Sequence, residues 1–410
     1  MPVYIKTKNQ KKSTVMKKLT TLSIALLFSA GAAFAQSNEA TLSQVGDDNS
    51  ATIDQAGDQN YTSLSQADGA IADVDQVSAS ESFVSLSQIG ASSATILQNN
   101  KNSVQGFGDQ WNTAESSKLA TQSGSGNTME ITQLSFFNQA YVDQLGANNS
   151  MKILQDGGIS NVARVMQDGS ENSVDISLIG SINRVKAEQY GSGNSADVSV
   201  TGSRNNESGG SGTSYVYQDG SNQSATVTVT GDRNYYDVEQ YGIGSNASVS
   251  FDGNDNRAVL SQDGNFNAIT ATVESGDLNT FDISMLNNSN SAKYVVEAGN
   301  SNDIDETVSG QGNQTVMRIE SDGALSSSNI LDVTKTGNSN VLSGVIIGSG
   351  NEITTMQMGN RNSIGTTFLT KDGIDVTGSG NTISISQMSN DNMSLNSVTG
   401  SGNSISVTQQ

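Results

Sequence analysis

Asparagine recurs along this chain every eleven residues, and this period constrains the fold more than any other feature. With the Asn as position 0, apolar residues fall at +2 and +4, Gln often at +6, and Gly at +8; Asn38–Gly46 shows the unit and Asn49–Gly57 repeats it. Such self-similarity is the signature of a repeat architecture. The spacing is 11, with an occasional 12, within the runs of Asn at 38, 49, 60; 127, 138, 149, 161, 172, 183, 194, 205; 256, 267, 279, 290, 302, 313; 329, 340, 351, 362; and 381, 392, 403.

Each repeat has the pattern of one β-strand followed by one tight turn. Positions 0, +2, +4 and +6 alternate with odd positions that are mostly polar, such as Ser173, Asp175 and Ser177. Because successive side chains of a strand point to opposite faces, the even positions are predicted to face inward and the odd ones water. Gly at +8, followed by short polar residues, is typical of a turn that needs positive φ.

One such strand cannot bury its apolar side alone, so successive strands are expected to fold face to face. Stacking these 22-residue strand–turn–strand pairs predicts an all-β fold, a two-sided β-solenoid with cross-β, amyloid-like stacking. Residues 36–410 have room for about 17 stacked pairs. A disordered, amide-rich tract is the alternative, but disorder would not keep apolar residues in register with the Asn.

In-register stacking predicts Asn above Asn and Gln above Gln, with their amides hydrogen-bonded along the stack. We therefore expect assembly to depend on amide ladders and on the turn glycines. The predicted ladder residues are Asn38, Gln44, Asn49, Gln55, Asn138, Gln144, Asn149, Gln155, Asn161, Gln167, Asn403 and Gln409, and the predicted turn residues are Gly46, Gly57, Gly146 and Gly169. The pattern is irregular near residues 99–122, and residues 205–212 are interpreted as an insertion between strands.

The first 35 residues have the features of a secretory signal peptide. Six lysines and no acidic residue precede an apolar run from Leu19 to Phe28, and Ala33-Phe34-Ala35 supplies a small-residue cleavage site. The apolar segment is short for a membrane span. The predicted domains are thus a signal peptide at 1–35, with Met1 or Met16 as the start, and the repeat region at 36–410. Without the six lysines, 14 basic residues face 41 acidic ones, a net charge of −27.

Composition excludes several classes of function. The chain has no His and no Cys, which rules out Ser-His-Asp or Cys-His nucleophiles and thiolate or imidazole metal sites. The acidic surplus argues against a nucleic-acid partner, because phosphate binding needs clustered Lys and Arg. We expect no catalytic, cofactor or metal site, and therefore no enzyme. Gly46-Asp-Asp-Asn49 offers oxygen ligands of the kind that bind calcium. Asp and Asn are common in tight turns, however, so this segment does not by itself predict a calcium site.

The segment Asn38-x5-Gln44-x-Gly46-x-x-Asn49-x-Ala51-x3-Gln55 closely resembles the curlin repeat, the unit of curli-type amyloid fibre subunits. Only the leading Ser of the family pattern differs, since Asn38 stands in its place. The resemblance implies export as an unfolded chain through an outer-membrane secretion pore, with the chain itself and a nucleator subunit as partners. It also implies a secreted location, in an extracellular fibre or at a bacterial cell surface. Major subunit and nucleator, and the export route, stay open.

The last strand, Asn403–Gln409, is followed by no polar cap, and an uncapped strand invites addition of another copy. The expected function is therefore self-assembly into curli-like extracellular amyloid fibres that serve biofilm matrix, adhesion and surface attachment. A monomeric β-solenoid adhesin or ligand-binding cell-surface rod is the alternative, and a polysaccharide-acting solenoid is a more distant one. The acidic surplus is interpreted as a brake on premature assembly, or simply as a solvated face.

Overall fold

The computed structural model describes residues 3–6, 37–105, 119–206, 215–272, 280–297, 302–320, 328–365 and 373–410. The chain divides into two compact units, residues 1–194 and 195–410. Every regular element in the described ranges is a β-strand. None of these ranges contains a helix long and apolar enough to cross a membrane.

The first unit consists of two stacks of strands, and successive strands of the chain alternate between them. Stack A contains β1 (Val3–Lys6), β3 (Ser50–Asp58), β5 (Ile71–Ser80), β7 (Ser93–Asn99), β10 (Thr128–Gln133), β12 (Ser150–Asp156) and β14 (Ser173–Ile179). Stack B contains β2 (Glu39–Val45), β4 (Tyr61–Ala67), β6 (Phe83–Ile89), β8 (Ser103–Gln105), β9 (Ala120–Ser123), β11 (Gln139–Ala147), β13 (Val162–Ser170) and β15 (Arg184–Ser192).

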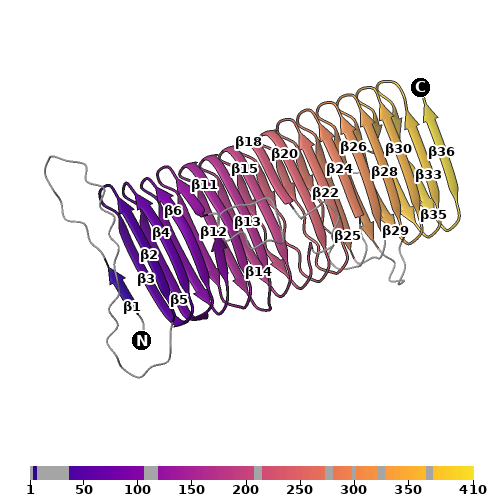
Figure 1. Ribbon diagram of the computed structural model, residues 1–410. Helices are drawn as coiled ribbons and strands as arrows, with labels where there is room; N and C mark the ends of the chain where they lie inside the picture. Colours follow the sequence, from indigo (N-terminus) through magenta and orange to yellow (C-terminus); the bar gives the residue numbers. More distant parts are fainter. Residues whose placement is uncertain are drawn as a thin grey trace. The chain divides into compact units, whose positions relative to one another are not determined.

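Within a stack, neighbouring strands are parallel and in register. β2 pairs with β4 so that Leu42 lies beside Leu64 and Gln44 beside Gln66, a separation of one 22-residue repeat. We call one strand of each stack, with its turns, a rung. Figure 1 shows the strands of a stack lying side by side, each joined by short turns to strands of the other stack. The exception is β1, which pairs antiparallel with β3, placing Val3 beside Gln55.

The second unit has the same construction. Its stack A contains β16 (Ser195–Asp197), β17 (Val200–Thr201), β19 (Ser224–Thr226), β21 (Asn246–Ser248), β23 (Ala268–Thr270), β25 (Ser291–Glu297), β27 (Gln314–Glu320), β29 (Val341–Ile347), β31 (Ser363–Ile364), β32 (Ile374–Thr377), β34 (Met393–Ser394) and β35 (Asn396–Thr399). Its stack B contains β18 (Tyr215–Ser221), β20 (Tyr235–Ile243), β22 (Arg257–Asp263), β24 (Thr280–Leu286), β26 (Asp303–Ser309), β28 (Ile330–Thr336), β30 (Glu352–Met358), β33 (Thr382–Gln387) and β36 (Ser404–Gln409).

The core of each unit is the narrow layer between its two stacks. In β3, Ala51 and Ile53 are buried while the alternating Thr52 and Asp54 are half-buried. This period of two buries the even positions, because a strand with one face against a partner must alternate. The prediction of an all-β, two-sided solenoid is confirmed. The described residues form about 15 stacked rungs rather than about 17, since several rungs contain extra residues and are longer than 22.

Some strand positions are interrupted. β8 pairs with the first residues of both β6 and β11, and β9 pairs with the later residues of the same two strands. β31 and β32 divide the strand position beside β29 in the same way. A single strand position is thus filled by two pieces of chain, and the stacking continues on both sides of the interruption.

The predicted domain features lie largely outside the described residues. Residues 1–2 and 7–35 of the predicted signal peptide are outside them, as are residues 106–118 of the irregular segment near 99–122. Residues 207–212 of the predicted insertion at 205–212 are also outside. The described residues on either side of residues 207–214 both adjoin β20 or the residue before it: the Asn206 N–H donates to the Asn234 carbonyl, and Tyr215 pairs with Asp237.

Candidate functional site

The glutamines at +6 of stack B in the first unit form a continuous hydrogen-bonded ladder. The Gln44 Nε2 donates to the Gln66 Oε1 at 2.8 Å, and each later Gln donates in the same sense to the Gln of the next rung. The further donor–acceptor distances are 3.0 Å for Gln66–Gln88, 2.7 Å for Gln88–Gln122, 2.7 Å for Gln122–Gln144, 2.8 Å for Gln144–Gln167 and 2.9 Å for Gln167–Gln189. Because Gln66 to Gln189 are fully buried, each unmade bond would leave a polar group desolvated.

A second ladder follows stack A. It begins at Gln55, whose Nε2 donates to the Gln76 Oε1 at 2.9 Å, and continues through Gln98 and Gln133 to Gln155. Leu178 occupies the next +6 position and ends it. The ladder glutamines also donate across the core to the opposite stack: the Gln155 Nε2 bonds the Gln139 carbonyl at 3.1 Å. One amide therefore links its own stack along the axis and both stacks across it.

In the second unit the ladder is interrupted. Gln218, Gln240 and Gln262 bond in sequence, and Gln357, Gln387 and Gln409 do so further on. Between these runs the +6 positions of stack B hold Met285, Val308 and Lys335. In stack A of this unit the corresponding positions include Val229, Phe251, Ile319 and Ile346, all buried. These rungs therefore rely on apolar packing where the first unit uses amides.

The asparagines at position 0 bond mainly to backbone. The Asn38 Oδ1 accepts the Asn60 N–H at 3.0 Å, one rung along. Its Nδ2 donates to the Gly57 carbonyl at 3.0 Å. Other Asn Oδ1 atoms accept a backbone N–H of the next rung in the same way. The pairs are Asn49 with the N–H of Ala70, Asn138 with that of Asn161, Asn149 with that of Asn172, and Asn161 with that of Asn183.

Among the described residues, direct bonds between Asn side-chain amides occur at some rungs and not at others, as where the Asn403 Nδ2 donates to the Asn381 Oδ1 at 3.0 Å. The short Asn side chain reaches the turn backbone beside it, so it fastens turns rather than forming a pure amide stack.

The turn glycines combine positive φ with a close approach between rungs. Gly46, Gly57, Gly146 and Gly169 have φ of +87°, +115°, +102° and +135°. A Cβ on Gly146 would lie 1.9 Å from the Gly169 carbonyl oxygen, and one on Gly57 would lie 1.8 Å from the Ala79 carbonyl oxygen. Real Cβ atoms do not approach backbone so closely, and L residues are strained at these φ values. At these four positions a residue with a Cβ would force the turn or a neighbouring rung to shift.

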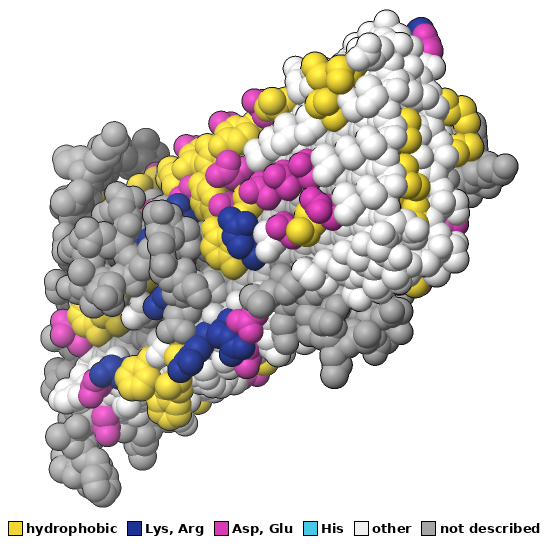
Figure 2. All heavy atoms as spheres, turned by 90° about the vertical axis from the view of Figure 1, so that its right-hand side faces the viewer, with side chains coloured by type: hydrophobic (Ala, Val, Ile, Leu, Met, Phe, Trp, Pro, Cys, Tyr) yellow, Lys and Arg dark blue, Asp and Glu magenta, His cyan; other side chains and the backbone are white. Residues whose placement is uncertain are grey.

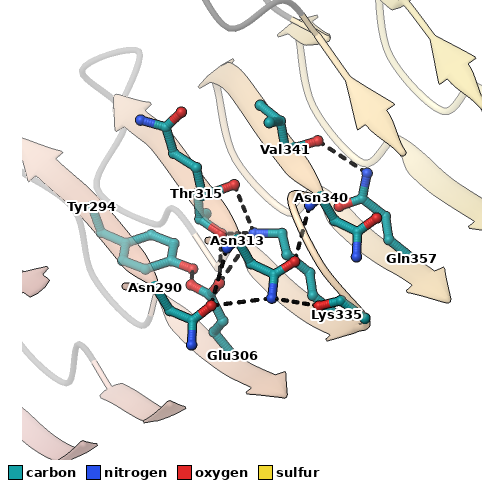
Figure 3. Close-up of polar contacts among 11 residues, drawn as sticks. Asn290, Tyr294, Glu306, Asn313, Thr315, Lys335, Asn340, Val341 and Gln357 are labelled. Atoms are coloured by element: carbon teal, nitrogen blue, oxygen red, sulfur yellow. Dashed lines mark hydrogen bonds and ion pairs between the residues drawn. The ribbon is translucent and has the colours of Figure 1, made fainter. Parts of the chain in front are cut away.

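A buried polar cluster replaces the ladder in the second unit, and sequence reasoning did not find it. Lys335 at +6 of β28 and Glu306 at +4 of β26 are both fully buried, with 3.2 Å between the Nζ and the Oε1. Figure 3 shows the Tyr294 and Thr315 hydroxyls, from β25 and β27, converging on the same carboxylate. The Lys335 Nζ also donates to the Gln314 carbonyl at 3.0 Å, as a ladder Gln would.

This cluster places opposite charges in the apolar core. Burial lowers the pKa of Lys335, and the Glu306 carboxylate opposes that shift. Beyond Lys335, the Gln357 Oε1 is buried and accepts no hydrogen bond from the described residues. Charged residues at inward positions were the available signal: Glu306 and Lys335 follow Asn302 and Asn329 by four and six residues. The repeat pattern does not reveal that the two residues form a pair, because they belong to different repeats.

Charged side chains on the outer surface also stack. Figure 2 shows a cluster of acidic side chains on the face in view, with basic side chains beside it. In stack B of the second unit, Asp282, Asp305 and Asp332 lie in successive strands. Burial and these neighbouring carboxylates raise the pKa of Asp305. Stacked like charges at strand spacing are unfavourable, so this column opposes the stacking of its own rungs.

One basic pair is arranged differently. Arg164 of β13 lies beside Lys186 of β15, yet both have compensating neighbours. The Arg164 guanidinium lies 5.0 Å from the centre of the Tyr141 ring. The Lys186 Nζ is 2.8 Å from the Glu188 carboxylate. These contacts reduce the repulsion between two stacked cations.

The outermost strands of the two units present open edges. β36 pairs with β33 on one side, and no strand of the described residues pairs with its other side. Among the described strands, β2 likewise pairs on one side alone, with β4. An open strand edge offers a row of backbone donors and acceptors for another strand.

The geometry agrees with a comparison against known families. A family model described as the curlin associated repeat matches residues 35–67, 124–157, 215–242 and 348–388. A comparison with curated proteins gave no match. Proteins with this repeat are in general subunits of curli-type extracellular fibres, a structural class and not a class of enzymes. With four matched segments in the repeated, stacked fold described above, the chain is a member of the curlin-repeat family.

Proposed function

We propose that this protein is secreted and self-assembles into curli-like amyloid fibres that contribute to biofilm matrix, adhesion and surface attachment. The observation that carries the proposal is the open edge of β36, which continues a stack already built from parallel, in-register strands. A second copy can add strands there with the same backbone bonds that join β33 to β36. The predicted signal peptide, secretion pore and nucleator subunit complete the proposal.

The direction of the backbone bonds identifies which atoms of β36 would recruit the next strand. Along stack B, odd positions donate to the following rung: the Thr382 N–H bonds the Asn403 carbonyl at 2.8 Å, and the Met388 N–H bonds the Gln409 carbonyl at 2.9 Å. By the same pattern, Ser404, Ser406 and Thr408 direct their N–H groups toward the open edge. The residues at even positions of the repeat, such as Ile405 at +2, direct their backbone groups back to β33.

A proline at an open-edge position therefore tests assembly without breaking the fold. Ser406→Pro removes one donor from the open edge and none from the pairing with β33. The mature variant is expected to keep its β-sheet circular dichroism, to stay monomeric, and to form no thioflavin-positive fibres, whereas Ser406→Ala forms them. Fibres of the unmodified chain should give a meridional reflection at about 4.7 Å. An unmodified chain that stays monomeric, or a Pro variant that polymerises normally, would contradict the proposal.

The acidic surplus is proposed to slow assembly before export is complete. Burial raises the pKa of Asp75, Asp237 and Asp305 above the ordinary Asp range, so these carboxyls take up protons early on acidification. Lower pH then removes repulsion within and between copies. The fibrillation lag is expected to shorten as pH falls from neutral toward the pI of about 4.2, and with added salt. A lag that lengthens on acidification would refute this brake.

A monomeric adhesin or ligand-binding rod is the second candidate, and surface aromatic side chains favour it. Tyr61 and Phe83 stack in successive strands, with ring centres 4.9 Å apart. Tyr217 contacts both Tyr215 and Tyr241, with ring centres 5.4 and 5.3 Å away. A purified chain that stays monomeric and binds a surface or glycan through these rings would support the second candidate over the fibre. Turnover of a glycan would point to an enzyme instead.

A further inference from the structure

The two ends available for joining copies are stepped, and the shape of the steps dictates how copies meet. In the second unit, the chain winds from β35 of stack A to β36 of stack B, so β36 lies about half a strand spacing further along the stacking axis than β35. In the first unit, β2 of stack B precedes β3 of stack A, so β2 lies about half a strand spacing nearer to the start of the stack than β3. Each end therefore presents one protruding strand beside one recessed strand.

The simplest junction would place β2 of a second copy directly on β36. The two protruding strands would then pair, but the recessed strands β35 and β3 would be two strand spacings apart, about 9.6 Å. One strand position would stay empty, and the inner side chains of both recessed strands would lack a neighbour along the stack. Half of the backbone bonds of a complete rung would be lost.

We propose that copies of this chain join head to tail with a half-turn about the stacking axis, so that β3 of one copy pairs with β36 of another and β2 pairs with β35. The half-turn exchanges the two stacks, and the protruding strand of each copy then fills the recess of the other. Strand direction is preserved. The two strands of a rung run in opposite directions, and a half-turn reverses direction while it exchanges the stacks, so every new pair stays parallel. This inference rests on the proposed assembly.

Hydrogen-bonding groups on β36 and β3 match across this junction. The Gln409 Nε2 donates to the Met393 carbonyl at 2.8 Å, and in interior rungs the second N–H of the same amide bonds the next Gln. On the other side, the hydrogen bonds of Gln55 run through its Nε2, to the Glu39 carbonyl and to Gln76. The Gln55 Oε1 is thus the acceptor that would receive Gln409 and join one copy's stack B ladder to the other's stack A ladder.

The remaining positions of the two strands are compatible. Ile405 and Val407 are inward residues of β36, and in the junction they stack on Ala51 and Ile53 of β3. The outward residues of β36 are Ser404, Ser406 and Thr408, so Asp54 of β3 meets no carboxylate across the junction. This contrasts with the aspartate columns inside the chain, where like charges lie in successive rungs.

β1 occupies the edge of β3 that the junction requires. It pairs antiparallel with β3 from Val3 to Lys6, within the predicted signal peptide. Both β1 and an incoming β36 need the same backbone groups of β3, so they exclude one another. Removal of residues 1–35 would open this edge, and the half-turn junction is expected only for the mature chain.

Cysteine cross-linking distinguishes the two junctions, because the chain has no native cysteine. Copies of the mature chain carrying Ser406→Cys are mixed with copies carrying Thr52→Cys of β3, or with copies carrying Thr41→Cys of β2, and fibres are grown under mild oxidation. All three residues are outward, at +3. Stacked +3 positions have Cα atoms about 4.8 Å apart, within the range of roughly 4.4–6.8 Å that a disulfide spans.

The half-turn junction predicts disulfide-linked dimers from the Thr52→Cys mixture and none from the Thr41→Cys mixture on a non-reducing gel. Dimers from the Thr41→Cys mixture alone would overturn the half-turn and favour the direct junction. Fibres that yield dimers from neither mixture would overturn head-to-tail joining through β36 altogether. If no fibres form at all, the proposed function itself fails, so the two failures are distinguishable.

Discussion

The buried pair of Glu306 and Lys335 allows a sharp test of how this core is stabilised. Lys335→Gln restores the residue type that most rungs carry at +6. The new amide can donate to the Gln314 carbonyl, as Lys335 does, and to the Gln357 Oε1, which now accepts no hydrogen bond from the described residues. The substitution nevertheless leaves the Glu306 carboxylate buried without its cation. Glu306→Gln creates the converse problem for Lys335.

The expected magnitudes follow from burial. Removing one partner of a buried ion pair costs roughly 3–5 kcal/mol, because the remaining charge stays desolvated. In Lys335→Gln, the new hydrogen bond to the Gln357 Oε1 adds roughly 0.5–1.5 kcal/mol to the free energy of unfolding. The single variant should therefore lose about 2–4 kcal/mol of unfolding free energy. In the double variant both charges are gone, the Tyr294 and Thr315 hydroxyls still have an amide acceptor, and stability should be close to that of the parent.

Unfolding is best measured in the Ser406→Pro background, which is expected to keep the chain monomeric. Urea midpoints report the overall loss, and hydrogen exchange of β26 and β28 reports whether the loss is local to the cluster. If the ion pair controls the stability of the cluster, the double variant is more stable than either single variant. Additive losses, or single variants as stable as the parent, would show that the ion pair is not the controlling interaction.

Three further predictions address the turns and the surface. Gly146→Ala is expected to cost about 3 kcal/mol or more, because its Cβ meets the Gly169 carbonyl oxygen; the control Gly402→Ala, with φ +70° and no atom within 4 Å, should cost about 1 kcal/mol in the same urea unfolding. Burial, together with the neighbouring Glu239 carboxylate, raises the pKa of Asp237 to about 6. The protonated carboxyl therefore stabilises the fold near pH 4, and this stabilisation is lost as pH rises through 6. Asp237→Asn should flatten the dependence of unfolding free energy on pH in this range, and an unchanged dependence would contradict the assignment. Ile182 has φ +60°, so Ile182→Gly should raise the urea midpoint by an amount equivalent to about 1 kcal/mol, and a lower midpoint would show that its side-chain packing outweighs backbone strain.

The period of eleven was sufficient to predict the architecture of each rung. It placed Ala51 and Ile53 inside, Thr52 outside, and Gln44 one rung from Gln66, because alternation and in-register stacking follow from strand geometry alone. The bonding of the asparagines was less predictable. An Asn above an Asn suggests an amide stack, but the side chain is one methylene shorter than Gln and reaches turn carbonyls first, as Asn38 does.

The interruptions and the buried charges could not be obtained from the repeat template. The chain near residues 99–122 departs from the pattern because extra residues separate Gln105 from Ala120, although both belong to one strand position. A repeat pattern with a fixed period of eleven residues cannot accommodate such extra residues, so the segment looks irregular in the sequence. Glu306 and Lys335 were missed for a related reason, since only the three-dimensional register brings +4 of one rung beside +6 of the next.

The interrupted strands have a consequence for how such a chain can be altered. β8 and β9, like β31 and β32, hold their pairings with the rungs before and after them even though additional residues separate the two pieces. A flexible peptide inserted at such a point would add mainly loop-closure entropy, about 0.6 kcal/mol for each doubling of the inserted length. Foreign peptides could thus be grafted between Gln105 and Ala120, or between Gly365 and Gly373, and repeated at regular intervals along a fibre. The solenoid would then act as a display scaffold whose cargo is changed without altering the number or register of its rungs.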